Sequence, residues 1–212
     1  MEYQIWLNGE YFPRNEAKIS LLDRGFRLGD VVFDNLDLFG PLSEVIGGIG
    51  VPWFQVLGNH DVNREAEDLG SNETFIRHFG PANYALDWGP VHFVVLDNVF
   101  WTQKDGRLSY EARLRPDVLD FIRNDLAGVP RNKLVVFMMH IPLGGVAEKE
   151  QFFELFENRP ATLSISAHRH IQEHFFFGAE EGWDGDAPHH HLVNVTVCGS
   201  WWRGAPDENG IP

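Results

Sequence analysis

The stretch that decides the fold is Leu134-Val135-Val136-Phe137-Met138-Met139, which leads directly into His140-Ile141-Pro142. Six apolar residues in succession, with no polar alternation, are typical of a strand that is buried on both faces. Such a strand belongs to a sheet that other elements cover on both sides. The histidine at its end stands where α/β sheets place their functional sites, outside the carboxyl ends of the strands.

Strand and helix patterns alternate on both sides of this stretch, and the alternation predicts an α/β fold. Asn8-Gly9 is a two-residue turn signal, and it predicts a hairpin within residues 3–20. Apolar periodicity predicts helices at 36–46, 73–79, 115–126 and 151–157, the first of them ending at Gly47-Gly48. Apolar runs predict strands at 52–57, 84–88, 91–97 and 162–166.

Composition excludes several classes of protein. The chain has 212 residues, and 43% of its side chains are hydrophobic, which is enough for a folded core and excludes an intrinsically disordered chain. Its 21 glycines and 12 prolines are too many for a helical bundle. The 17 basic and 31 acidic residues give a net charge of −14, so we expect no nucleic-acid-binding surface.

Cysteine content and apolar runs set further limits. Cys198 is the only cysteine, which excludes an internal disulfide and a cysteine-based zinc site, and leaves histidines and carboxylates as metal ligands. No apolar run is long enough for a membrane span, and the N-terminus lacks the features of a signal peptide. The default expectation is therefore a cytoplasmic protein without a membrane partner, and the sequence leaves the oligomeric state open.

Side chains that can bind metal ions gather in short segments immediately after predicted strands. Each segment alone has an ordinary interpretation, because an aspartate after glycine is usually a turn or cap residue. A lone histidine at a strand end is likewise more often a hydrogen-bonded structural residue than a ligand. Their coincidence favours a metal site. The segments are Gly29-Asp30 with Asp34, Gly58-Asn59-His60-Asp61, His140-Ile141-Pro142 and His168-Arg169-His170.

These residue types suit a hydrolytic metal centre. A carboxylate such as Asp30 can bridge two cations about 3.5–4 Å apart, and Asn59 offers a neutral carbonyl oxygen. The imidazoles of His140, His168 and His170 suit zinc, iron, manganese or nickel. In an extended segment His168 and His170 would point to the same face, so one short segment could serve two ions.

The remaining residues of the segments suit supporting roles. His60 is better placed as a donor to a leaving-group oxygen than as a ligand, with Asp61 holding its ring. Gly29 and Gly58 keep the main chain close to the metals, where a Cβ would intrude.

The order of these segments resembles that of the calcineurin-like metallophosphoesterases. That family carries D-x-H, G-D-x-x-x-D, G-N-H-[DE], a lone histidine after a strand, and G-H-x-H. Four of these five are present here in order, from Gly29-Asp30-Val31-Val32-Phe33-Asp34 to Ala167-His168-Arg169-His170, with Ala167 in place of the usual glycine. The resemblance covers residues 29–212.

This resemblance implies an α/β fold, a sandwich of two packed mixed sheets flanked by helices, with a binuclear metal centre at the strand ends. It implies that Asp30 bridges the metals and that His170 belongs to the second ion. By the same resemblance, the first ion would be completed by Asn59, His140 and His168, and the leaving group would be assisted by His60 and Asp61.

The family's first motif is absent, because no Asp-x-His stands upstream of Gly29. We therefore expect one ion to bind better than two. Residues 1–34 resemble instead the opening of a class IV aminotransferase, the pyridoxal-phosphate family of branched-chain and D-amino-acid transaminases. The resemblance rests on Ile5-Trp6-Leu7-Asn8-Gly9-Glu10 and Ala17-Lys18-Ile19-Ser20-Leu21-Leu22-Asp23-Arg24-Gly25-Phe26. The cofactor lysine of that family has no counterpart here, so no pyridoxal phosphate is expected.

Together these features predict two segments joined at a chimeric junction. Residues 1–28 would be the aminotransferase-like segment, and residues 29–212 a metallophosphoesterase domain that is incomplete at both ends. A natural but divergent N-terminus is the alternative to the junction. His189-His190-His191 could hold a surface metal with Asp184 and Asp186, but we expect this run to form a solvated loop.

The leading hypothesis is a hydrolase of phosphate mono- or diesters that uses a metal-bound hydroxide, with an activity impaired by the missing motif. Its cofactors would be up to two divalent or trivalent ions of manganese, iron or zinc, and its partner a small phosphoester substrate. The first alternative is a non-catalytic metal-binding or structural remnant of the fold. The second is a fragment of a class IV aminotransferase.

Overall fold

The computed structural model of the chain describes residues 4–7, 10–13, 39–64, 66–104 and 107–194. The chain divides into two compact units, one of residues 1–31 with 196–212 and one of residues 32–195. In the first unit the described residues form an antiparallel hairpin of β1 (Gln4–Leu7) and β2 (Glu10–Pro13), with Leu7 opposite Glu10. This confirms the predicted hairpin.

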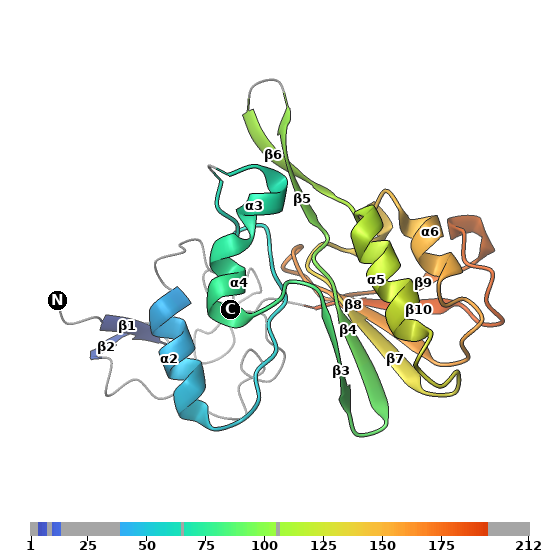
Figure 1. Cartoon of the computed structure of the whole chain (residues 1–212), viewed down its shortest axis with the longest axis horizontal. Coiled ribbons are helices and arrows are strands. Elements are labelled where there is room, and N and C mark those ends of the chain that lie inside the picture. The colour runs from blue at the N-terminus through green and yellow to red at the C-terminus, as the bar shows by residue number, and fades with distance from the viewer. Residues whose placement is uncertain (1–3, 8–9, 14–38, 65, 105–106, 195–212) are drawn as a thin grey trace, which may run out of the picture. The chain divides into compact units, whose positions relative to one another are not determined.

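A six-stranded mixed sheet forms the centre of the second unit (Figure 1). Its strands lie in the order β3 (Tyr84–Trp88), β4 (Val91–Val95), β7 (Leu134–Met138), β8 (Thr162–Ser166), β10 (His189–Val193) and β9 (Glu173–Phe177). The inner four strands run parallel to one another, and β3 and β9 are antiparallel edge strands. Val135, Val136 and Phe137 of β7 are buried, which confirms the prediction of a strand covered on both faces.

Two helices, α5 (Pro116–Leu126) and α6 (Lys149–Glu154), share one buried cluster with the central strands (Figure 1). Ile122 of α5 and Phe152 of α6 pack with Phe137 of β7 in this cluster. The rings of Phe137 and Phe152 meet edge to face at 4.9 Å between centroids. Short 3-10 turns, η2 (Leu143–Gly145) and η3 (Ala179–Glu181), lie next to β7 and β9 in the chain.

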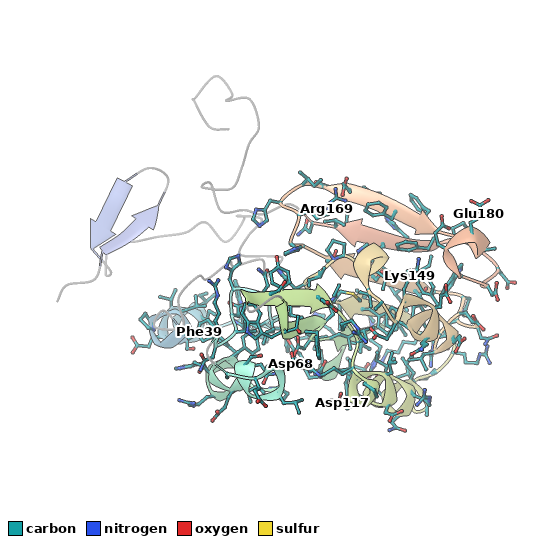
Figure 2. The ribbon with its side chains drawn as sticks, turned by 90° about the horizontal axis from the view of Figure 1, so that it is seen from above. Phe39, Asp68, Asp117, Lys149, Arg169 and Glu180 are labelled. Atoms are coloured by element: carbon teal, nitrogen blue, oxygen red, sulfur yellow. The ribbon has the colours of Figure 1, made fainter. Side chains whose placement is uncertain are left out.

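A second buried cluster contains the neighbours of the candidate site residues. Leu57, Val62 and Ile141 come from loops and pack there with Phe75. The cluster also takes in Phe39, which is labelled in Figure 2 at the start of its helix. The elements around it are α2 (Phe39–Ile49), α3 (Asp68–Ser71), α4 (Glu73–Phe79), and the antiparallel pair β5 (Val99–Lys104) and β6 (Arg107–Ala112).

Two local predictions were wrong in part. Residues 52–57 form no strand, and Leu57 is buried in the second cluster as part of a loop. The helix predicted at 36–46 is α2, and it continues through Gly47-Gly48 to Ile49. Gly50, with a φ of 76°, adopts the left-handed conformation that follows many helices, and this glycine stands directly after the helix.

The run His189-His190-His191 is a strand, so its prediction as a solvated loop was wrong. His189 and His191 of β10 are 1% and 0% exposed, respectively. Their ring nitrogens contact hydroxyl groups of the parallel neighbour β8, and the five residues form what we call the hydroxyl–imidazole row: Thr162, His189, Ser164, His191 and Ser166. Hydrogen bonding to these hydroxyls compensates for the burial of both imidazoles.

The predicted fold class is confirmed: the described residues form an α/β fold with a large mixed sheet, a smaller second sheet and flanking helices. The second sheet, β5–β6, is an antiparallel hairpin. Among the described residues, no helix is long and apolar enough to cross a membrane.

Candidate functional site

Parallel strands bring three loops to one edge of the sheet. Asp97-Asn98 follow β4, His140 follows β7, and His168 follows β8. Because β4, β7 and β8 are parallel neighbours, their carboxyl ends meet at the same edge. Asn59 reaches this edge from the loop between α2 and α3.

The side chains of Asn59, His140 and His168 are in direct contact. Nε2 of His140 lies 2.8 Å from Oδ1 of Asn59 and 3.1 Å from Nδ1 of His168. The two imidazole rings stand at 71° to each other, with centroids 4.9 Å apart. Three of the five predicted metal ligands therefore converge, although they come from separate parts of the chain.

A tight turn carries Asn59. The amide N–H of Asp61 donates to the carbonyl oxygen of Gly58 at 3.0 Å, and the amide N–H of Gly58 donates to Oδ2 of Asp61 at 2.8 Å. A Cβ added at Gly58 would lie 3.0 Å from both Cε1 and Nδ1 of His140, closer than nine in ten real Cβ contacts. The absence of a side chain at Gly58 therefore lets the ring of His140 approach the turn.

Gly58→Ala is expected to weaken metal binding about 10-fold, because the added methyl group displaces the ring of His140 from Asn59. Titration of purified protein with Mn²⁺ by isothermal calorimetry measures the effect. Gly144→Ala, where the nearest atom to the added Cβ is a ring carbon of Phe177 at 3.8 Å, is the matched control. Unchanged affinity in Gly58→Ala would contradict the close approach of the ring.

Burial keeps the two site imidazoles neutral. It lowers the pKa of His140 to about 3, and the nearby His168, His60 and His170 add to the shift. Burial also lowers the pKa of His168, again with contributions from His170 and His60. A neutral imidazole offers a lone pair, which is the form that binds a metal ion.

The segment after β8 is not extended, which corrects the expectation for His168 and His170. Both residues have positive φ, 67° and 57° respectively, in the left-handed region that side chains other than glycine rarely adopt. The condition under which both rings would point to the same face, an extended segment, is therefore not met. Arg169, labelled in Figure 2, lies between them and pairs with Glu173 at 2.6 Å. Strained main-chain conformations of this kind concentrate at functional sites.

His60 lies within the same turn and has a described partner in Arg64. The guanidinium of Arg64 donates to Nδ1 of His60 at 3.2 Å, which places the ring proton of a neutral His60 on Nε2. The described hydrogen bonds of Asp61 run to Gly58. The proposed role of Asp61 in orienting the His60 ring stays a prediction, and Asp30 lies outside the described residues.

Sequence analysis missed two residues near the site. The ring of Tyr110 meets His168 edge to face at 5.7 Å and stacks on Trp101 at 6.2 Å. Both aromatic residues belong to the β5–β6 hairpin, for which the run Val99-Phe100-Trp101-Thr102 was the available strand signal. The other missed residue is Asn98, whose side chain contacts the main chain beside His140.

The three converging side chains carry donor atoms that suit a single metal ion. Two imidazole nitrogens and an amide oxygen suit a first-row divalent metal, and the space left by Gly58 lets them meet. Within the described part of the chain, no group of three or more His, Cys, Asp or Glu side chains could hold a metal ion. The described residues thus bring together three donor groups, from two histidines and one asparagine.

Comparison with known protein families decides the assignment. The family model for calcineurin-like phosphoesterases matches residues 2–172, which is most of the chain. The chain belongs to the calcineurin-like phosphoesterase family. Within this calcineurin-like phosphoesterase the match includes the N-terminal segment, and the resemblance of that segment to class IV aminotransferases is not supported. No curated protein matches the chain.

Proposed function

We propose that this calcineurin-like phosphoesterase hydrolyses small phosphate mono- or diesters with the help of bound metal ions. Membership of the family supports phosphoester hydrolysis in general. The observation that carries the proposal for this chain is the contact of Asn59 and His168 with the same nitrogen of His140. Three potential metal ligands that are far apart in the chain thus meet at the edge of the sheet where α/β folds place their sites.

In this proposal Asn59, His140 and His168 hold one metal ion, which is manganese, iron or zinc. Such an ion would neutralise phosphate charge and lower the pKa of a bound water. Local neutralisation matters because the chain has a net charge of −14, which does not attract an anionic substrate. Asp30 is the proposed bridge between this ion and a second one, to which His170 would also belong.

The proposed role of His60 is to donate a hydrogen bond to the leaving group. Arg64 contacts Nδ1 of the ring, so the N–H of the neutral ring is at Nε2, from which it can donate a hydrogen bond to a leaving-group oxygen. Asp61 closes the turn that carries Asn59 and His60. The proposal therefore assigns to His60 a hydrogen bond that stabilises the leaving group, with Asp61 supporting the turn.

One observation favours a second candidate function, a binding protein that holds a single metal without turnover. In the described residues, no cluster of at least three His, Cys, Asp or Glu side chains suits a metal ion, and the sequence has no Asp-x-His motif upstream of Gly29. A centre with one ion lacks the second positive charge that a binuclear phosphoesterase uses to stabilise both the attacking and the leaving oxygen.

Metal-free protein, prepared with a chelator, is expected to be inactive towards bis-p-nitrophenyl phosphate and p-nitrophenyl phosphate and to gain activity with added Mn²⁺ or Zn²⁺. Calorimetry in parallel gives the number of bound ions, for which we expect one tight site. Metal binding without hydrolysis of either ester would favour the binding protein. Hydrolysis that persists without metal would contradict both candidates.

A further inference from the structure

We infer that Asn98 is a positioning residue for His140. The side-chain amide of Asn98 holds both main-chain polar groups of Ile141, the residue that follows His140. The inference rests on the proposed function, since it assumes that His140 is a metal ligand. Asn98 stands outside every motif that predicted the site, and its side chain reaches the His140 loop from the end of β4.

The contact between Asn98 and Ile141 is made at two points. Nδ2 of Asn98 donates to the carbonyl oxygen of Ile141 at 2.7 Å, and the amide N–H of Ile141 donates to Oδ1 of Asn98 at 3.0 Å. Asn98 is 0% exposed, so water does not compete for these groups. Two antiparallel hydrogen bonds to one residue fix both the position and the rotation of its peptide groups.

Asn98 is itself held firmly by its surroundings. Its carbonyl oxygen accepts a hydrogen bond from the amide N–H of Arg113 at 3.1 Å. The preceding Asp97 is buried and pairs with Arg115 at 3.2 Å. Arg115 in turn contacts Asp68, labelled in Figure 2 within α3, at 3.3 Å. The side-chain amide of Asn98 therefore extends from a main chain that these contacts hold in place.

The rest of the His140 loop is held by main-chain contacts and one further side chain. The carbonyl oxygen of His140 accepts from the amide N–H of Ala167 at 3.0 Å, next to the end of β8. Beyond Ile141, the amide N–H of Leu143 lies 3.3 Å from Nε2 of His191. Asn98 thus secures Ile141, which together with Pro142 lies between the contact of His140 with Ala167 and the contact of Leu143 with His191 of β10.

Loss of the Asn98 amide would free Ile141 and let the main chain at His140 shift. Metal ligands must be held within about 0.5 Å of their productive positions by the groups around them. Residues that orient ligands typically change metal affinity 10–100-fold when they are replaced. The contact of 2.8 Å between His140 and Asn59 would be the first to open.

Asn98→Leu, which keeps the side-chain size and removes both hydrogen bonds, tests the inference. We expect it to weaken binding of Co²⁺ 10–100-fold and to alter the visible absorption bands of the bound Co²⁺. Asn98→Asp keeps an acceptor for the N–H of Ile141 and serves as a second variant if Asn98→Leu does not fold. In metal-free protein, the ring NMR signals of His140 should shift in both variants.

The matched control is Arg159→Ala. Arg159 lies away from the site, and it also holds main-chain groups, namely the carbonyl oxygens of Leu126, Val129 and Pro130. It should lower stability without changing Co²⁺ affinity or the His140 signals. Unchanged affinity, spectrum and signals in the Asn98 variants would overturn the inference. Failure of the wild type to bind Co²⁺ would instead count against the proposed function, and the His140 signals would then decide the inference alone.

Discussion

Replacing His140 by alanine is expected to lower metal-dependent phosphoester hydrolysis by at least about 100-fold. His140 contacts both Asn59 and His168 through Nε2, so its loss removes the group on which the candidate metal site converges. Even residues that only orient metal ligands cost 10–100-fold in affinity or activity, so loss of a ligand is expected to reach the upper end of that range or exceed it.

Stabilisation of the fold by bound metal distinguishes loss of the metal site from loss of folding. In the wild type, metal at 100 times its Kd is expected to raise the free energy of unfolding by about 2.7 kcal/mol. In His140→Ala the same metal concentration should give little increase, because the affinity is lower. Urea unfolding with and without Mn²⁺ measures both proteins under identical conditions.

His78→Ala is the control for this experiment. His78 is exposed on α4, and its described ring contacts are with Phe39 and Phe79. It should keep wild-type hydrolysis and the full stabilisation by metal. If His140→Ala retained hydrolysis within threefold of the wild type, the candidate site would not be the place where the reaction occurs.

Local sequence patterns predicted those helices and strands whose boundaries carry a recognisable sequence signal. The helix predicted at 73–79 is α4, which is followed by Gly80 with a φ of 93°. The helix predicted from Arg115-Pro116 is α5, because proline is well suited to the first helical turn. The strand at Thr162–Ser166 was also confirmed as β8. In each case the signal lies within a few residues of the boundary.

Predictions failed where long-range packing decided the structure. Residues 52–57 have the apolar composition of a strand, yet burial of Leu57 against other loops needs no pairing partner. The histidines of β10 were predicted to lie in a solvated loop. Their burial depends on Ser164 and Ser166, which the parallel pairing of β8 and β10 brings beside them.

The candidate site was predictable in its residues but not in its conformation. The motifs identified Asn59, His140 and His168, since ligand chemistry follows from residue type. The left-handed main chain at His168 could not be derived from its sequence, because such strain is imposed by the surrounding structure. The role inferred for Asn98 likewise depends on a contact across 43 residues.

Acid is expected to destabilise the fold through the hydroxyl–imidazole row. Burial lowers the pKa of His189 to about 3 and that of His191 to about 4, with smaller contributions from neighbouring histidines. An unfolded histidine has a pKa of about 6.5. Between pH 6.5 and 4 the unfolded chain therefore binds protons that the folded protein does not, and the free energy of unfolding falls as the pH falls.

The geometry of the row explains why protonation is costly. The amide N–H of Leu143 points to Nε2 of His191, so this nitrogen accepts and the ring proton lies on Nδ1, facing Ser164. A second proton on Nε2 would face the N–H of Leu143 and remove the acceptor that Ser166 uses. Each of the two buried histidines should contribute about 1.4 kcal/mol per pH unit to the slope of the unfolding free energy against pH.

His191→Gln removes one of these titrating groups, and urea unfolding between pH 7 and 4.5 measures the result. We expect the slope of the unfolding free energy against pH to fall by about 1.4 kcal/mol per unit relative to the wild type. His140 titrates with the same sign, so the difference between the two proteins is the relevant quantity. Thr162→Val, which removes the hydroxyl partner of His189 but no titratable group, should lower stability while keeping most of the slope.

An unchanged slope in His191→Gln would mean that His191 is protonated in the folded protein as readily as in the unfolded chain. The row would then have to accept a charge between β8 and β10 without loss of stability. That outcome is incompatible with a ring that is 0% exposed and whose nitrogens contact only neutral groups among the described residues. Burial without a counter-charge penalises the imidazolium, and the acid sensitivity follows from that penalty.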